Sequence, residues 1–150
     1  MKIRQIFRKK WLITWILLFS LSFITPPVIA QITTGIEAAK EGANYYQLQD
    51  YQKAVEYWQE AADKFSQAGD KTNQVIALSN LSLTYQKISE WDEAKTTIDK
   101  SLEILANQPE TLENQNLLAQ TIDIRGKYYQ NKGEYENALE IWQKSADIYT

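Results

Sequence analysis

The chain has 150 residues, enough for one domain of ordinary size, and it contains no Cys and no His. It therefore has no disulfide, thiolate nucleophile, imidazole base or Cys/His metal site, and only an all-carboxylate site remains open. Residues 31–150 hold eleven basic against nineteen acidic residues, a formal charge of −8, which is a poor match for a nucleic-acid backbone.

Residues 1–30 have the order of a secretory signal peptide. Five basic and no acidic residues accompany an apolar run from Trp11 to Ile24, which as a helix reaches about 21 Å. That is short of the roughly 30 Å hydrocarbon core of a bilayer, and two prolines interrupt any extension. The small residue Ala30 predicts cleavage after this position. We expect an exported protein, periplasmic or secreted; an uncleaved membrane anchor at residues 11–24 is the alternative.

From Gln31 onward, apolar residues follow the helical period, which predicts an all-α domain over residues 31–150. The predicted helices are 33–48, 51–67, 72–88, 91–106, 110–131 and 135–149. Asp50 predicts an N-cap for the second helix, and Gly69 predicts its end. Ser89 predicts an N-cap for the fourth helix, Pro109 the first turn of the fifth, and Gly133 a tight turn before the sixth.

Three alanines, Ala54, Ala94 and Ala138, mark three copies of one pattern. Twelve positions before each alanine stands a small residue, nine before stands a tyrosine, and four after stands a bulky apolar residue. These columns are Gly42, Ser82 and Gly126; Tyr45, Tyr85 and Tyr129; and Trp58, Ile98 and Trp142. Closely crossing helices need small residues on both sides, so the pattern predicts stacked helical hairpins.

These columns resemble the tetratricopeptide repeat, whose pattern is W-x2-L-G-x2-Y, then A-x3-F, then P. The second copy, for example, has Leu78-x2-Leu81-Ser82-x2-Tyr85 followed by Ala94-x3-Ile98. The resemblance covers about residues 35–150 and implies a right-handed α-solenoid of about three hairpins, at about 35–68, 75–108 and 119–150. The copies lie 40 and 44 residues apart, against about 34 in the standard repeat, and the terminal Pro is missing. This spacing resembles the long-repeat subtype found in kinesin light chains.

In this family, the first helix of each hairpin lines a concave groove, which implies a protein or peptide partner. Carried over by position, the groove candidates are Ala39, Ala43 and Tyr46; Ser79, Leu83 and Gln86; and Asp123, Lys127 and Gln130. An ordinary solvated face is the alternative for each of them. The Lys and Asn clamp that some members use for C-terminal carboxylates is absent from these positions, so an acidic chaperone-type tail is not the expected ligand.

Catalysis receives little support from the sequence. Acidic pairs such as Asp92-Glu93 and Glu134 with Glu136 fall at predicted helix starts, where carboxylates stabilise the helix dipole. No glycine-rich phosphate loop is present. We therefore predict no enzyme activity, no catalytic residue, no cofactor and no metal.

Apolar residues near the end of the last predicted helix, Leu139, Ile141, Trp142 and Ile148, have no evident covering element. Self-association through this end is one explanation, continuation into a longer protein is another, and a marginally stable last helix is the third. The chain resembles the N-terminal part of bacterial tetratricopeptide proteins that carry a caspase-like CHAT protease domain, but the Cys–His pair of such a protease is missing. The leading hypothesis is an exported interaction scaffold; the alternative is a regulatory or targeting fragment of a larger enzyme.

Overall fold

The computed structural model describes residues 25–148, and these residues form six α-helices and no strand. The helices are α2 (Thr25–Gln47), α3 (Tyr51–Ala68), α4 (Lys71–Lys87), α5 (Trp91–Ala106), α6 (Leu112–Asn131) and α7 (Tyr135–Ile148). The predicted all-α class is confirmed. The apolar run Trp11–Ile24, on which the predicted signal peptide and the alternative membrane anchor depend, lies outside the described residues. Among the helices that are described, none combines the length and hydropathy needed to span a bilayer.

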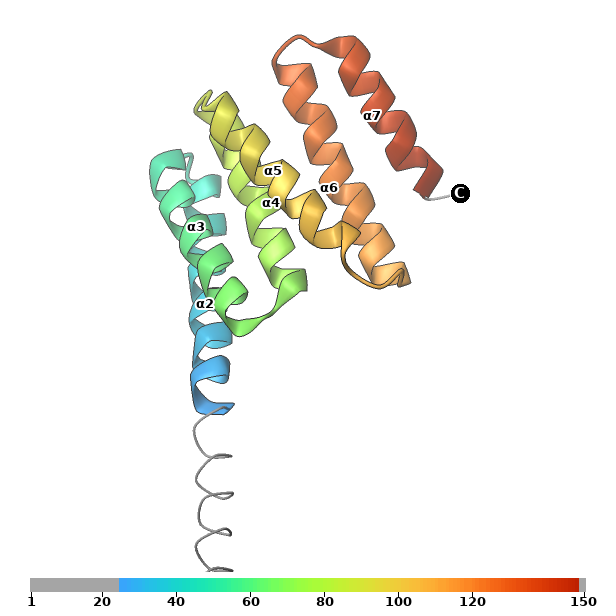
Figure 1. Ribbon diagram of the computed structural model, residues 1–150. Coiled ribbons are helices and arrows are strands. Elements are labelled where there is room, and N and C mark those ends of the chain that lie inside the picture. The colour runs from blue at the N-terminus through green and yellow to red at the C-terminus, as the bar shows by residue number, and fades with distance from the viewer. Residues whose placement is uncertain (1–24, 149–150) are drawn as a thin grey trace, which may run out of the picture.

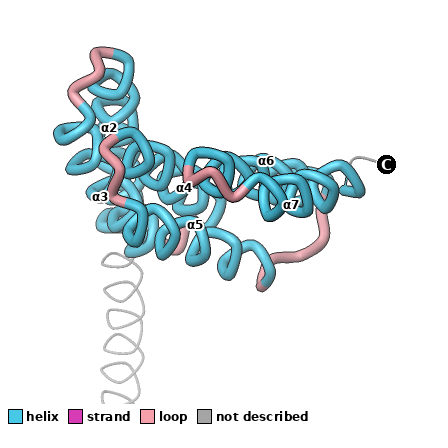
Figure 2. The backbone as a smooth tube through the Cα atoms, turned by 90° about the horizontal axis from the view of Figure 1, so that it is seen from above, coloured by secondary structure: helices cyan, strands magenta, loops and turns pink. Residues whose placement is uncertain are grey.

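The helices pair in chain order into hairpins, α2 with α3, α4 with α5, and α6 with α7, and the hairpins stack side by side (Figure 1). At each junction the second helix of one hairpin packs against the first helix of the next, α3 against α4 and α5 against α6. Viewed from above, the stack runs from α2 and α3 at one end to α6 and α7 at the other (Figure 2). The stack predicted from the repeated columns is therefore present.

The largest boundary difference is at the start of α2, which begins at Thr25 rather than at residue 33. Pro26 and Pro27 fall in its first turn, where a missing N–H is tolerated because that turn has no intrahelical acceptor. The helix runs through Ala30, the predicted cleavage position, so the described chain includes residues that cleavage would remove. Cleavage itself stays a prediction.

Two capping predictions are confirmed and two are wrong. The Asp50 carboxylate accepts a hydrogen bond from the Lys53 backbone N–H at 3.3 Å, and Gly69 ends α3 with φ of 73°. The N-cap of α5 is Glu90 rather than Ser89, because Ser89 adopts the left-handed conformation that ends the preceding turn. Pro109 precedes α6 without entering it.

The start of α6 is set by Thr111, two residues after that proline. Thr111 has an extended backbone, and its hydroxyl accepts a hydrogen bond from the Asn114 N–H at 3.1 Å. A threonine hydroxyl at this position satisfies a helix N–H that a proline could not, because proline has no side-chain acceptor. The helix therefore begins at Leu112 and not at residue 110.

The turn inside each hairpin has the same backbone in all copies. The residues with positive φ are Gln49 at 63°, Ser89 at 62° and Gly133 at 78°. In each turn the next N–H donates to the carbonyl of the tyrosine column; in the first, Asp50 N and Tyr45 O are 3.0 Å apart. These are the bonds of a Schellman ending, whose left-handed residue is usually glycine. The tight turn predicted at Gly133 is confirmed.

The small and large columns meet across each hairpin. Ala54, Ala94 and Ala138 are all buried, as the stacking prediction requires. A Cβ added at Gly42 would lie 2.8 Å from Cδ2 of Trp58, and one at Gly126 would overlap the Trp142 indole. Where Ile98 replaces the tryptophan, a serine fits: the Ser82 hydroxyl donates to the Ala94 carbonyl at 2.8 Å. Glycine therefore accompanies tryptophan because the indole fills the space of a side chain.

The apolar core is concentrated in the first three helices. The main cluster consists of Ala38, Ala54, Trp58, Ala61, Ala62, Phe65, Ala77, Leu78 and Leu81. A second, smaller cluster of Val75, Leu105 and Leu117 joins α4, α5 and α6. The first hairpin is thus joined to the second by a larger apolar contact than the second is to the third.

Candidate binding cleft

The predicted groove residues lie on α2, α4 and α6, and the structure gives them different environments. Ala39, Ala43, Tyr46, Leu83 and Asp123 are half-buried, Lys127 and Gln130 are exposed, and Ser79 and Gln86 are buried. The predicted set therefore does not form one continuous accessible surface.

Ser79 does not face a groove. Its hydroxyl oxygen lies 3.0 Å from that of Ser101 on α5 and 3.4 Å from that of Thr121 on α6. With 5% of its surface exposed, Ser79 joins three helices from inside the stack. Its assignment to a partner-binding surface is wrong, because the third hairpin covers this position of α4.

Gln86 is also unavailable to a partner. Its side-chain oxygen accepts a hydrogen bond from the Asn131 amide at 3.0 Å, and its amide group lies 3.5 Å from the Ile124 carbonyl oxygen. Only 6% of its surface is exposed. Gln86 therefore ties α4 to α6, and its assignment to the groove is likewise wrong.

A cleft of about 270 Å³ opens between α2 and α4, and side chains of α3 also line it. Its lining residues are Ile36, Ala39, Lys40 and Ala43 from α2, Trp58 and Phe65 from α3, and Asn73, Ile76 and Ala77 from α4. The alanines leave room between the helices, and the two aromatic rings come from the buried core. Two of the predicted residues, Ala39 and Ala43, are therefore placed together, at one end of the predicted groove.

The sequence reasoning missed the two isoleucines of this cleft. Ile36 and Ile76 are each 40% exposed, an unusual position for a large aliphatic side chain. They lie 40 residues apart, the spacing of the first two repeats, so they occupy the same position in consecutive copies. That recurrence of an isoleucine outside the core columns is the signal that could have identified them.

One charged side chain lines the cleft. Lys40 is exposed and takes part in none of the ion pairs found among residues 25–148. The other polar lining residue, Asn73, is already engaged, because its amide donates to the Asp70 carboxylate at 2.7 Å. The cleft thus combines an apolar interior with one free positive charge.

Tyr46, at the end of the predicted groove on α2, packs edge-on against Tyr51 with ring centroids 5.4 Å apart. Its partial burial raises the pKa of its phenol, and the neighbouring Tyr51 raises it further. The phenol is therefore neutral near pH 7. Its hydroxyl can donate a hydrogen bond to a partner or accept one from it, but it supplies no charge.

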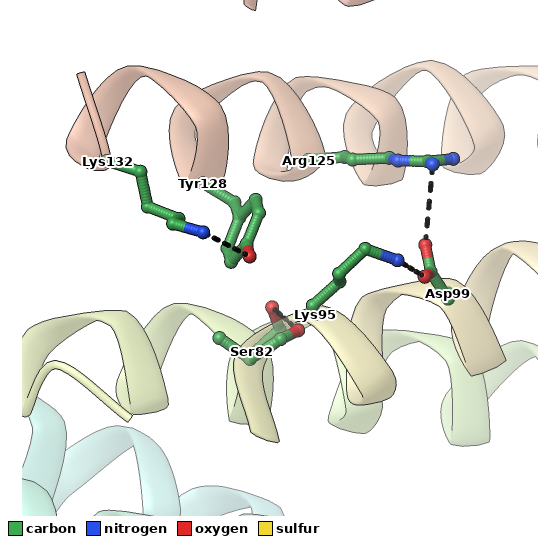
Figure 3. Close-up of polar contacts among 7 residues, drawn as sticks. Ser82, Lys95, Asp99, Arg125, Tyr128 and Lys132 are labelled. Atoms are coloured by element: carbon green, nitrogen blue, oxygen red, sulfur yellow. Dashed lines mark hydrogen bonds and ion pairs between the residues drawn. The ribbon is translucent and has the colours of Figure 1, made fainter. Parts of the chain in front are cut away.

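Beside its apolar contacts, the junction between α5 and α6 holds a set of polar side chains (Figure 3). One carboxylate oxygen of Asp99 on α5 accepts a hydrogen bond from the Lys95 ammonium at 2.5 Å. The other carboxylate oxygen of Asp99 lies 3.7 Å from a guanidinium nitrogen of Arg125 on α6. The hydrogen bond to Asp99 raises the pKa of Lys95. These side chains are about one-third to one-half exposed, so the ion pairs contribute little net stability.

The acidic residues at the hairpin turns lie at or just before helix starts. Asp92 and Glu93 lie in the first turn of α5, and Glu136 lies in the first turn of α7, as the sequence predicted. Glu134 accepts a hydrogen bond from the Asn137 amide at 2.8 Å. Across the part of the chain that the structure describes, no group of three or more acidic residues is placed to hold a metal ion.

A profile of the tetratricopeptide repeat family matches residues 37–107, which span the C-terminal part of α2 and all of α3, α4 and α5. The third hairpin lies outside the match, although its Gly126, Ala138 and Trp142 repeat the contacts of the first. A search of curated proteins returned no match. Residues 37–107 are therefore similar to tetratricopeptide repeats, which commonly mediate protein–protein interactions and are typically non-catalytic.

Proposed function

We propose that this protein is an exported scaffold that binds a protein or peptide in the cleft between α2 and α4. The observation that carries the proposal is the cleft itself: exposed isoleucines from two adjacent repeats flank a space that alanines leave open. Clefts with an apolar lining and a few polar groups are the usual form of a binding site. The similarity of residues 37–107 to a repeat that commonly binds proteins supports the same function.

The energy available in the cleft suits a modest peptide contact. Covering an exposed isoleucine contributes about 1.5–3 kcal/mol, so Ile36 and Ile76, each 40% exposed, contribute about 1 kcal/mol apiece. Lys40 adds attraction for an acidic group beside the anchor. We therefore expect the preferred ligand to carry an apolar side chain next to a carboxylate.

The test is capture of partners from the envelope fraction of the native host by photo-crosslinking, with the full chain as bait. Ala43→Glu places a carboxylate in the cleft and should remove the specific partner. Ala106→Glu, an exposed alanine near the end of α5, is the matched control and should retain it. Circular dichroism of both variants verifies folding. An unchanged set of partners for a folded Ala43→Glu protein would contradict the proposal.

Export is tested separately, by the intact mass of the protein recovered from its host. Loss of residues 1–30 is the expected result and would support a periplasmic or secreted location. A chain that retains these residues and partitions with membranes would favour the anchored alternative.

A second candidate function is that the stack is the regulatory or targeting part of a larger enzyme, such as a CHAT-domain protease. The apolar outer face of α7, where Leu139 is 57% exposed, favours it. An antibody raised against residues 31–150 distinguishes the candidates in an immunoblot of the host. A species near 17.4 kDa, or smaller after cleavage, supports the scaffold, whereas a much larger species supports the enzyme.

A further inference from the structure

The two ends of the stack differ in polarity. At the first junction, Ala77 and Leu81 of α4 belong to the core shared with α3. The residues 40 positions earlier, on α2, are Glu37 and Glu41, and both are exposed. The face of α2 that corresponds to an inter-hairpin contact is therefore acidic. Polar outer faces of this kind close one end of a repeat stack.

The corresponding face of α7 is apolar. Within the stack, the equivalent residues on α3 and α5 meet the next hairpin: Val55 packs on the core of α3 and α4, and Trp91 lies edge-on to Tyr128 of α6 at 6.2 Å. On α7 these positions hold Leu139 and Tyr135. They are 57% and 69% exposed, and within residues 25–148 only α6 packs extensively against α7.

Four apolar residues of α7 form a single ridge, and three of them are exposed. Tyr135, Leu139, Trp142 and Ala146 follow a spacing of four, three and four residues. This is the spacing with which two helices pack along a common seam. Trp142 is half-buried against its own hairpin, whereas Ala146 is exposed. The ridge is therefore shaped to receive another helix.

We propose that a second copy of this chain covers the ridge, with α7 packed against α7 in a symmetric, tail-to-tail dimer. The other end of a second copy does not fit, because a head-to-tail contact would press Glu37 and Glu41 against Leu139. Those carboxylates would lose their water without gaining a partner, which is costly. The α7 ridge of the second copy presents matching apolar side chains at the same spacing. A two-fold contact of this kind closes at the dimer and forms no filament.

The absence of cysteine from the sequence makes a clean test available. Full chains carrying Leu139→Cys, Asn44→Cys or both substitutions are treated in intact cells with a short bismaleimide and analysed by immunoblot. Asn44 is exposed and lies on the same face of α2 as Glu37 and Glu41, at the position that Tyr128 holds in the third hairpin. Leu139→Cys should give a cross-linked dimer, Asn44→Cys should stay monomeric, and the double variant should again stop at the dimer.

A third substitution separates a specific contact from random collision. Tyr135→Glu in the Leu139→Cys chain places a charge in the ridge at a residue that is 69% exposed, so folding should be unaffected while the cross-linked dimer is lost. Four results would overturn the inference. They are a monomer with Leu139→Cys, a dimer of equal yield with Asn44→Cys, a ladder above the dimer with the double variant, and a dimer that survives Tyr135→Glu.

Discussion

The hairpin turns allow a comparison within one chain, because the same left-handed position holds glutamine, serine and glycine. Ser89 has φ of 62° and Gly133 has φ of 78°. A residue with a Cβ costs about 1–2 kcal/mol in this conformation. Glycine avoids that cost but loses about 0.4–1 kcal/mol more through the freedom of its unfolded chain. Ser89→Gly should therefore raise the free energy of unfolding by about 0.5–1 kcal/mol.

Thermal unfolding followed by circular dichroism measures this effect. For a chain of this size, Tm should rise by about 2–4 °C with Ser89→Gly and fall by a similar amount with Gly133→Ala. Ser89→Ala is the control, because it removes the hydroxyl but keeps the Cβ, and it should leave Tm nearly unchanged. If Ser89→Ala stabilises as much as Ser89→Gly, or if Gly133→Ala is neutral, backbone strain is not the cause and the reasoning fails.

Three further predictions concern the columns, the buried hydroxyls and the acidic turns. Gly42→Ser should lower stability by about 1–3 kcal/mol because the Trp58 ring fills its space, and adding Trp58→Ile, the pairing of the second hairpin, should recover part of the loss in urea unfolding. Ser79→Ala should cost only about 1 kcal/mol and should leave partner capture unchanged, since Ser79 lies inside the stack; loss of the partner with unchanged stability would return Ser79 to the binding surface. The Asn137 amide and Lys132 lower the pKa of Glu134 from its usual 4.5, so the stability it contributes is complete above pH 4.5 and is lost as the pH falls through the folded-state pKa. Glu134→Gln should make the fall of Tm below pH 4.5 slightly shallower, because an exposed pair contributes little, and an unchanged slope would show that Glu134 makes no such contribution.

The junction between the second and third hairpins has a smaller apolar contact than the junction between the first and second. The main core holds the first two hairpins together, while hydroxyls, amides and a partly exposed ion pair contribute much of the contact to α6. Opening there exposes less apolar surface, so it costs less free energy. The third hairpin is therefore expected to separate first, and the cleft between α2 and α4 to outlast it.

Sequence reasoning reached most of the fold because its signals are local. Helical periodicity, the Asp50 cap and the Gly69 ending act within a few residues, and the predicted helices match the observed ones closely from α3 to α7. The small and aromatic columns extended the prediction to stacked hairpins, since a position such as Gly42 needs a specific partner across the hairpin. The N-cap prediction for Ser89 was wrong because the sequence shows a serine just before a helix but does not show that its backbone is left-handed.

The binding surface depended on contacts between hairpins, which the periodicity of one helix does not contain. Ser79 and Ala39 occupy equivalent groove positions in consecutive repeats, yet α6 covers the first and the second lines an open cleft. Residue type alone shows that α2 carries acidic positions and α7 apolar ones, but only the tertiary structure places these two faces at opposite ends of the stack. Residue type and helical period thus determine which helices form. The tertiary structure decides which of their side chains are exposed, because a side chain leaves water only where a neighbouring helix packs over it.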